Sequence, residues 1–249
     1  MAHPITSTPS LSTRIRWSLK RRGLLGTLRL ALLKPPRALA SKLWDRIHRV
    51  DTAELSELHS FAIRSENLVH AIRYQATPTG VFRKMIGSLD IRHEDFEFVD
   101  FGSGKGRTLL LAAEFAFRGV TGIEFAPELH AIANRNISSF RGPRRCREVR
   151  SICIDAADYR LPARDCLLYF NFPFHEPVMQ AVLASVTQTI EQSRARVLLV
   201  NYEPKPGVTR LLSSSPWFRE VKRGSDHVIY ESLYCTPESN SKLESGAPR

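Results

Sequence analysis

Three glycines at alternate positions follow a short apolar segment near the middle of the chain. The stretch from Phe98 to Arg107 reads FVDFGSGKGR, and a run rich in Leu and Ala comes directly after it. Glycine lets the backbone turn sharply and approach a ligand closely, because it carries no Cβ atom. A strand, a glycine turn and a helix in this order form the carboxyl edge of an open parallel sheet, where ligands bind. The stretch therefore predicts a ligand-binding loop built around Gly102, Gly104 and Gly106.

An acidic side chain follows at the end of the next apolar segment. Glu124 lies 18 residues past Gly106, where a carboxylate can accept hydrogen bonds from a ribose diol. Two other nucleotide-binding patterns fail. The dinucleotide pattern GxGxxG needs glycine where Arg107 stands, and the phosphate-binding pattern GxxxxGK[ST] does not fit around Lys105. What remains is D-x-G-x-G-x-G from Asp100 onward, followed by an acid at the next strand end.

Two cations stand where the helix after the glycines is predicted to begin. The positive end of the helix dipole disfavours Lys105 and Arg107 there by about 0.3–1 kcal/mol each. A local rule that is broken at a suspected ligand loop indicates a functional role. Each side chain can pair with a carboxylate, from a cofactor or from the protein itself, or it can point outward into solvent. The sequence leaves these alternatives open.

Strands and helices are predicted to alternate beyond residue 95, as positioning such a loop requires. The predicted strands cover residues 96–101, 120–124, 149–154, 167–170, 196–201 and 227–234. The predicted helices of this part cover residues 107–118, 127–139 and 177–192. Upstream, composition and spacing predict helices over residues 14–33, 53–73 and 79–88. The alternation implies an α/β fold with a mostly parallel sheet covered on both faces.

The glycine loop and the acid after it resemble the class I methyltransferases that use S-adenosylmethionine. The resemblance covers roughly residues 74–234. It implies a Rossmann-like, seven-strand, mostly parallel sheet with helices on both faces, here behind a helical N-terminal extension. It also implies S-adenosyl-L-methionine as the cofactor and an activity of the class EC 2.1.1.-. The cofactor-binding residues that it implies in this part are Asp100, Gly102, Ser103, Gly104, Gly106 and Glu124.

Two further segments match family elements. Tyr74-Gln75-Ala76-Thr77 is similar to the Y-x-P-[TS] element of disruptor-of-silencing-type lysine methyltransferases and their uncharacterised bacterial relatives, with Ala76 in place of Pro. This match implies that Tyr74 and Thr77 line the cofactor pocket, whereas an ordinary turn between helices is the alternative. Asp155, at the end of the third strand, is implied to face the adenine amino group.

The end of the fourth strand is the predicted active site. Asn171-Phe172-Pro173-Phe174 resembles the [DNS]-P-P-[FY] element of amino-group methyltransferases, with Phe172 replacing the first Pro. The resemblance implies that Asn171 holds the target nitrogen and that Phe174 packs against it. His175 or Glu176 could remove a proton from an ammonium group. The alternative is that these Phe rings belong to the core and the following residues only start a helix.

These observations lead to one main functional hypothesis and two alternatives. The main hypothesis is N-methylation of a protein lysine, a nucleobase or a small amine. A non-catalytic S-adenosylmethionine-binding module on the same fold is the first alternative. A nicotinamide-dependent oxidoreductase is disfavoured by Arg107 and by the absence of a hydride-transfer constellation. No metal site is expected, because the four cysteines form no CxxC pair and no zinc-ligand spacing.

The net charge of +11 comes almost entirely from the N-terminal segment. Residues 1–50 hold eleven Lys and Arg against one acid, Asp45, so that the remaining 25 basic and 24 acidic side chains nearly cancel. Within this segment, four apolar residues recur at helical spacing and three basic residues flank them: Leu39, Leu43, Ile47 and Val50, with Lys42, Arg46 and Arg49. Such a face can pack on the catalytic domain, lie on an anionic membrane or sit beside a nucleic-acid backbone.

The chain is expected to divide at residues 52, 90 and 235. Residues 1–52 form the basic N-terminal segment, partly disordered and then helical, and residues 53–90 form a helical lead-in. Residues 91–235 form the methyltransferase domain, and residues 236–249 a disordered tail. The longest uninterrupted apolar run has only five residues, whereas a membrane-spanning helix needs about 20. A cytoplasmic location is expected, with peripheral membrane contact left open.

Overall fold

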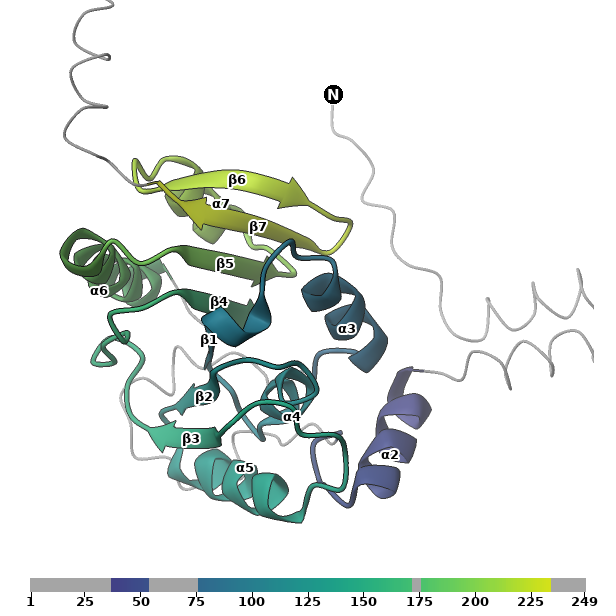
Figure 1. Cartoon of the computed structure of the whole chain (residues 1–249). Helices are drawn as coiled ribbons and strands as arrows, with labels where there is room; N and C mark the ends of the chain where they lie inside the picture. Colours follow the sequence, from purple (N-terminus) through teal and green to yellow (C-terminus); the bar gives the residue numbers. More distant parts are fainter. Residues whose placement is uncertain (1–36, 54–75, 172–175, 234–249) are drawn as a thin grey trace, which may run out of the picture. The chain divides into compact units, whose positions relative to one another are not determined.

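The computed structural model describes residues 37–53, 76–171 and 176–233 (Figure 1). The chain divides into two compact units, Met1–Trp44 and Asp45–Arg249, and the second contains a seven-stranded sheet. Its strands lie in the order β3-β2-β1-β4-β5-β7-β6. In chain order the strands are β1 (Glu97–Phe101), β2 (Gly119–Glu124), β3 (Val149–Cys153), β4 (Cys166–Asn171), β5 (Val197–Tyr202), β6 (Phe218–Arg223) and β7 (His227–Ser232). Only the pairings of β7 with β5 and β6 are antiparallel, so the predicted fold class is confirmed.

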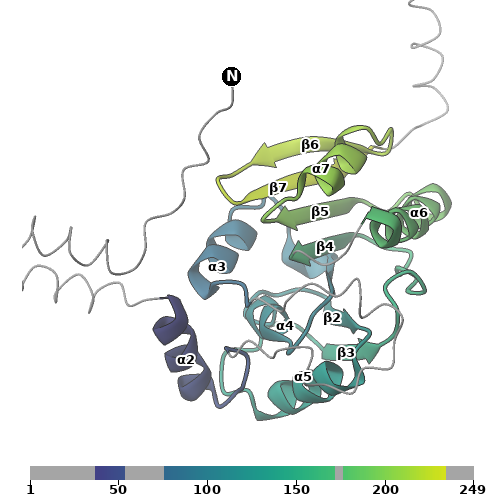
Figure 2. The same ribbon diagram turned by 180° about the vertical axis from the view of Figure 1, so that it is seen from behind.

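Helices cover both faces of the sheet, as the alternation predicts. They are α3 (Thr79–Gly87), α4 (Arg107–Ala112), α5 (Pro127–Ser139), α6 (Glu176–Ser193) and α7 (Pro206–Ser213), with a short 3-10 helix at His93–Asp95. A further helix, α2 (Arg37–His48), precedes them in the chain and spans the boundary between the two units. Alternate residues of β1 point to opposite faces. Val99 joins the core cluster that residues of α6 and α7 complete, whereas the Phe98 ring meets Phe82 of α3 on the other face. Figure 2 shows α6 and α7 on the side of the sheet turned toward the viewer.

The central strands are buried along their whole length, which explains their continuous apolar character. In β4 the first five residues are buried, and all six residues of β5 are buried. Because both faces of a central parallel strand are covered, its sequence cannot alternate between apolar and polar residues. Such strands bring their carboxyl ends to one sheet edge, where β1, β2, β3 and β4 end side by side.

One helix end and two elements differ clearly from the sequence-based expectation. The helix predicted over residues 107–118 ends at Ala112, and the chain continues in turns in which Glu114 and Phe115 donate to the third residue back. Strand β6 and helix α7 were not predicted. The sequence of β6, FREVKR, leaves five of six residues exposed, because an edge strand faces solvent and tolerates charge. The helices predicted over residues 14–33 and 53–73 lie outside the described residues.

Candidate functional site

The glycine loop between β1 and α4 has the backbone conformation that its sequence implies. Gly102, Gly104 and Gly106 all have positive φ, at 79°, 53° and 81°. This left-handed region is rarely open to residues with a Cβ atom, so glycine is required at each position. The amides of Gly102 and Ser103 both donate to the carbonyl oxygen of Ile123, at 2.9 and 3.0 Å. The loop is thereby held against the end of β2.

A fourth glycine, which the sequence did not single out, makes room for this loop. A Cβ atom on Gly122 of β2 would lie 2.6 Å from the hydroxyl of Ser103 and 2.6 Å from the side chain of Leu109. Ser103 is buried, and its hydroxyl has no hydrogen-bond partner among the described residues. The loop therefore presents a buried polar group next to its left-handed glycines.

Glu124 connects the loop to the end of β2. One carboxylate oxygen accepts a hydrogen bond from the Gly104 amide at 2.8 Å, and the other accepts from the Ala126 amide at 3.0 Å. Burial raises the pKa of Glu124, and these amide hydrogen bonds partly oppose that shift. A carboxylate offers about four acceptor positions, so Glu124 has capacity for a further donor such as a ribose hydroxyl.

Asp100 is a second buried carboxyl group beside the same loop. The Thr108 hydroxyl donates to Asp100 Oδ2. Burial, together with the charge of Glu124, raises the pKa of Asp100 to about 7, although the Thr108 hydrogen bond acts to lower this pKa. Two acidic side chains with raised pKa values therefore flank the loop.

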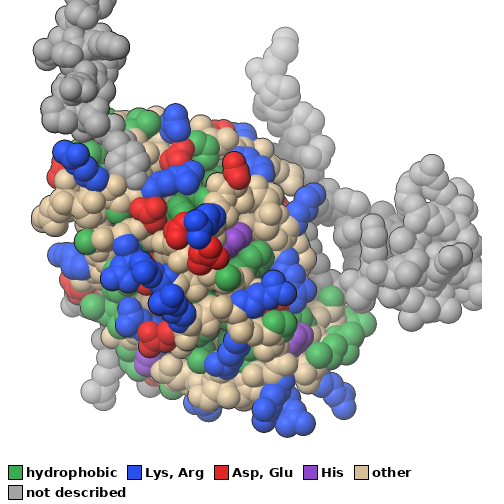
Figure 3. All heavy atoms as spheres, in the orientation of Figure 1, with side chains coloured by type: hydrophobic (Ala, Val, Ile, Leu, Met, Phe, Trp, Pro, Cys, Tyr) green, Lys and Arg blue, Asp and Glu red, His purple; other side chains and the backbone are tan. Residues whose placement is uncertain are grey.

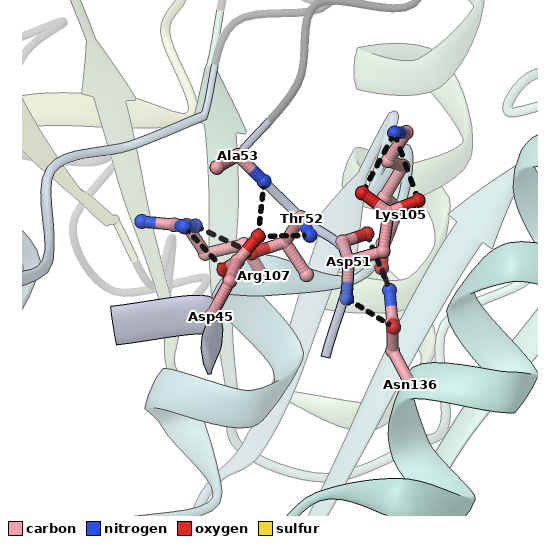
Figure 4. Close-up of polar contacts among 7 residues, drawn as sticks. All are labelled: Asp45, Asp51, Thr52, Ala53, Lys105, Arg107 and Asn136. Atoms are coloured by element: carbon pink, nitrogen blue, oxygen red, sulfur yellow. Dashed lines mark hydrogen bonds and ion pairs between the residues drawn. The ribbon is translucent and has the colours of Figure 1, made fainter. Parts of the chain in front are cut away.

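The two cations at the start of α4 point inward and pair with acidic side chains of the protein (Figure 4). Arg107 is buried; its Nη2 lies 2.7 Å from Asp45 Oδ1, and its Nε donates to the Thr52 hydroxyl at 2.7 Å. The ammonium of Lys105 lies 3.3 Å from each carboxylate oxygen of Asp51. Neither side chain is solvated, which decides between the alternatives that the sequence left open.

The segment that supplies these acids is itself fixed to the loop. The Asp45 carboxylate accepts hydrogen bonds from the amides of Thr52 and Ala53, both at 2.6 Å. On α5, the Asn136 side chain accepts from the Asp51 amide at 2.8 Å and donates to the carbonyl oxygens of Asp51 and Lys105, both at 2.9 Å. Sequence reasoning missed Asp45, Asp51 and Asn136. The cations at a helix start were the one signal that a carboxylate must be near.

A second polar cluster lies at the end of β4. The Asn171 amide donates to the Thr77 hydroxyl at 3.0 Å, and this hydroxyl is also 3.0 Å from the hydroxyl of Tyr169. Thr77 is 1% exposed. Burial raises the pKa of Tyr169 well above its ordinary value, so the phenol stays protonated at neutral pH. Thr77 and Asn171, which are 94 residues apart, are thus in direct contact.

The end of β5 adds two residues that the sequence did not indicate. Tyr202 pairs with Asn171 in the sheet register, and its ring stacks on that of Tyr169 with centroids 6.4 Å apart. The next residue, Glu203, has φ of 47°, a strained conformation for a residue with a side chain. The charge of Glu203 contributes to raising the pKa of Tyr169. An acidic side chain therefore lies close to the Asn171 cluster.

Asp155 follows the end of β3 and is half-buried. Its side chain accepts a hydrogen bond from the Ala157 amide at 2.9 Å, and its carbonyl accepts from the Asp158 amide at 3.0 Å. The amide of Ile154 donates to the carbonyl of Glu124 at 3.1 Å, which places Asp155 beside the end of β2. Three further residues that the sequence predicted for the site, Tyr74, Phe174 and His175, lie outside the described residues.

The described ranges contain no group of three or more His, Cys, Asp or Glu that could hold a metal ion. Nor does any helix within them have the length and apolar character needed to cross a membrane.

Comparisons with known proteins found similarity among solved structures. No family model matches the sequence, and no curated protein matches it. A SAM-dependent methyltransferase from Leishmania major is 14% identical with a TM-score of 0.44, over 63% of this chain and 71% of that one. A TehB-like SAM-dependent methyltransferase from Corynebacterium glutamicum is 14% identical with a TM-score of 0.43, over 61% and 86%. Magnesium protoporphyrin IX methyltransferase from Synechocystis, solved with bound SAM, is 14% identical with a TM-score of 0.40, over 61% and 76%.

Proposed function

We propose that this chain is an S-adenosylmethionine-dependent methyltransferase that methylates a nitrogen atom. The observation that carries the proposal is the hydrogen bond from the Gly104 amide to Glu124. It joins a left-handed glycine loop to a buried acid at the neighbouring strand end, which is where a nucleoside binds on an open parallel sheet. The sequence motif and this geometry both support a nucleoside site at this edge of the sheet.

The described residues fit S-adenosylmethionine. Glu124 has acceptor capacity for the ribose hydroxyls, and the left-handed glycines allow the backbone to approach the methionine part. The Ser103 hydroxyl is buried and has no partner among the described residues, so it can hydrogen-bond to the cofactor. Asp155, beside the end of β2, is our candidate for the adenine amino group.

Asn171 and Thr77 are our candidates for orienting the methyl acceptor. When bound, the cofactor supplies a methyl group activated by its sulfonium, so the protein needs chiefly to align a nitrogen lone pair and exclude water. Alignment alone can contribute about 7–11 kcal/mol to catalysis. The hydrogen bond between Asn171 and Thr77 fixes the amide at the strand end. Phe174 remains the predicted aromatic wall, and His175 the predicted proton acceptor.

The finer likeness to disruptor-of-silencing-type lysine methyltransferases rests on Tyr74 and Thr77. The contact of Thr77 with Asn171 supports it, because a residue of an ordinary turn has no need to reach the predicted active-site strand end. An acidic side chain close to Asn171, Glu203, suits an acceptor that arrives as a cation. We therefore favour an amine, such as a protein lysine, over a neutral nucleobase.

Ligand binding tests the cofactor assignment. S-adenosylhomocysteine and S-adenosylmethionine should raise the melting temperature, because a ligand that binds only the folded state stabilises it. NAD should have no such effect. Gly104→Val and Glu124→Ala should abolish the shift, whereas Gly80→Val, at a glycine with no atom within 4 Å of an added Cβ, should keep it. Normal binding by folded Gly104→Val and Glu124→Ala variants would refute the assignment.

Turnover separates an enzyme from a non-catalytic binding module. Mass spectrometry of cells with and without the protein should identify new methyl groups on nitrogen. With that acceptor, Asn171→Ala should lower methyl transfer at least about tenfold and leave the affinity for S-adenosylhomocysteine unchanged. Cofactor binding without any methyl transfer would favour the binding module instead.

A further inference from the structure

The last turn of α2 carries charge and apolar surface in an unexpected arrangement. Its one acid, Asp45, is buried against Arg107, whereas Ile47 is 62% exposed. An amphipathic helix ordinarily buries its apolar side and exposes its charges. Here the buried ion pair fixes the rotation of the helix: Trp44 and Asp45 are both buried, and the side that carries Ile47 faces outward.

The same apolar strip continues along α2. Leu39, Leu43 and Ile47 recur every four residues and therefore lie on one face of the helix. They are 58%, 53% and 62% exposed, and among the described residues the only other large exposed apolar side chain is Val221, at 45%. Three of the four such side chains thus gather in one strip, which scattered surface apolar residues do not do.

Basic side chains gather on α2 and beside its C-terminal end. Lys42, Arg46 and Arg49 are exposed on and directly after α2. The connection between α5 and β3 adds four more exposed arginines: Arg141, Arg144, Arg145 and Arg147. Figure 3 shows blue side chains at the lower right, where the end of α2 and this connection lie.

The arginine-rich connection is fixed to the end of α2. The Arg141 amide donates to the carbonyl of His48 at 3.1 Å, and the His48 and Phe140 rings stack with centroids 5.5 Å apart. Among the described residues of α2, the segment up to residue 53 and this connection, Asp45 is buried and Asp51 pairs with Lys105, which leaves Glu148 as the remaining acid. Seven further Lys and Arg, and no acid, precede residue 36 in the sequence.

We propose that this surface, the strip of Leu39, Leu43 and Ile47 with the basic residues on and beside α2, docks on an anionic lipid membrane. Positive charge draws the protein to acidic headgroups, and exposed aliphatic side chains enter the boundary between headgroups and acyl chains. A single-stranded nucleic acid would also attract the charge, but its bases stack on aromatic rings. The strip is aliphatic, which favours lipid.

Sedimentation of the full-length protein with vesicles tests this proposal without any cofactor. Vesicles of phosphatidylcholine and phosphatidylserine in about a 7:3 ratio should bind the wild-type protein at least about tenfold more tightly than pure phosphatidylcholine. In about 1 M NaCl, where the Debye length is about 3 Å, a fraction should remain bound through the aliphatic strip.

Two sets of variants assign the binding to its parts. Leu39→Gln/Leu43→Gln/Ile47→Gln should remove the salt-resistant fraction and weaken binding at least about tenfold, whereas Val221→Gln should leave it unchanged. Arg46→Gln/Arg49→Gln should weaken binding to the acidic vesicles only, with the exposed Arg118→Gln as the matched control.

Three outcomes would overturn the proposal. The first is wild-type protein that does not sediment with acidic vesicles, including the case in which it binds RNA or DNA instead. The second is a triple variant that binds as the wild type does. The third is a triple variant that melts at a clearly lower temperature, which would mean that the strip is covered by the protein itself.

Discussion

Asp100 and Glu124 place two acidic side chains in one buried region, and the charge of Glu124 raises the proton affinity of Asp100. Asp100 keeps its proton up to about pH 7, because burial and the charge of Glu124 both disfavour its ionised form. Glu124 also has a raised pKa, although three backbone hydrogen bonds stabilise its charge. Asp100 therefore titrates in the physiological range, and its protonation can be tested through folding stability.

Replacing Asp100 by Asn should remove a pH dependence of folding stability. Between about pH 4 and pH 7 the unfolded chain has lost a proton that native Asp100 retains, so the native state binds more protons and stability falls as pH rises. One pKa unit corresponds to about 1.4 kcal/mol, so the wild type should lose a few kcal/mol relative to Asp100→Asn across this window.

Urea unfolding of both proteins at several pH values measures this effect. Asp90→Asn, at an exposed acid, should follow the wild type. An identical slope for the wild type and Asp100→Asn would show that Asp100 is ionised throughout.

Thr77→Val should weaken both the fold and the predicted active site. The substitution removes one hydroxyl that is bonded to Asn171 and to Tyr169. Because loss of a partner in a buried hydrogen bond costs about 1–3 kcal/mol, the variant should unfold at lower denaturant and transfer methyl groups more slowly. Thr77→Ser keeps the hydroxyl and should retain most of both properties; equal losses in the two variants would argue against the hydroxyl.

At the scale of elements, a short segment before the sheet acts as a support for the glycine loop. Residues 45–53 contact the start of α4 through Arg107 and the loop itself through Lys105 and Asn136. The cations thus hold a neighbouring segment in place, which accounts for their unfavourable position at a helix start.

Breaking the Asp45–Arg107 pair from one side should be more harmful than removing it altogether. Asp45→Ala leaves a buried guanidinium without this carboxylate, and such changes cost about 3–5 kcal/mol. Asp45→Leu/Arg107→Met removes both charges and should recover much of that stability. Chemical denaturation of the single and double variants gives the coupling energy between the two side chains.

Arg92→Met, at an ion pair on the surface, is the control and should unfold as the wild type does. Strict additivity of the two substitutions at residues 45 and 107 would contradict a direct interaction.

Local patterns predicted most of the sheet and could not predict the contacts between distant segments. Apolar runs predicted β1 to β5, and the glycine spacing predicted the loop, because each of these patterns is contained in a stretch of a few residues. The segment FREVKR carries no apolar period, so β6 was missed. The Asp45–Arg107 pair spans 62 residues, and no spacing rule indicates which of many acids meets which base. Thr77 was found through a family motif rather than through local physics.

At the scale of the whole chain, the net positive charge and the predicted site lie in different parts of the sequence. Residues 51–249, which hold the predicted site, carry 25 basic and 24 acidic side chains, whereas residues 1–50 hold nearly all of the net charge. A nearly neutral part containing the site and a strongly basic N-terminal segment are suited to different tasks. The first holds the predicted site, and a positive charge like that of the second favours anionic partners, as we propose for α2.

The contacts of residues 45–53 join the end of α2 to the glycine loop, so the proposed membrane binding and ligand binding can be coupled. Asp45 belongs to α2 and forms an ion pair with Arg107, which directly follows the glycine loop. If occupancy of the loop changes the affinity of the protein for vesicles, then vesicles must change the affinity for S-adenosylhomocysteine by the same factor, since coupling free energy is reciprocal. We expect a factor of at least about five, measured by sedimentation with and without S-adenosylhomocysteine and by titration with and without vesicles. Unequal factors would violate the cycle, and a factor of one would make the N-terminal segment a tether with no influence on the pocket.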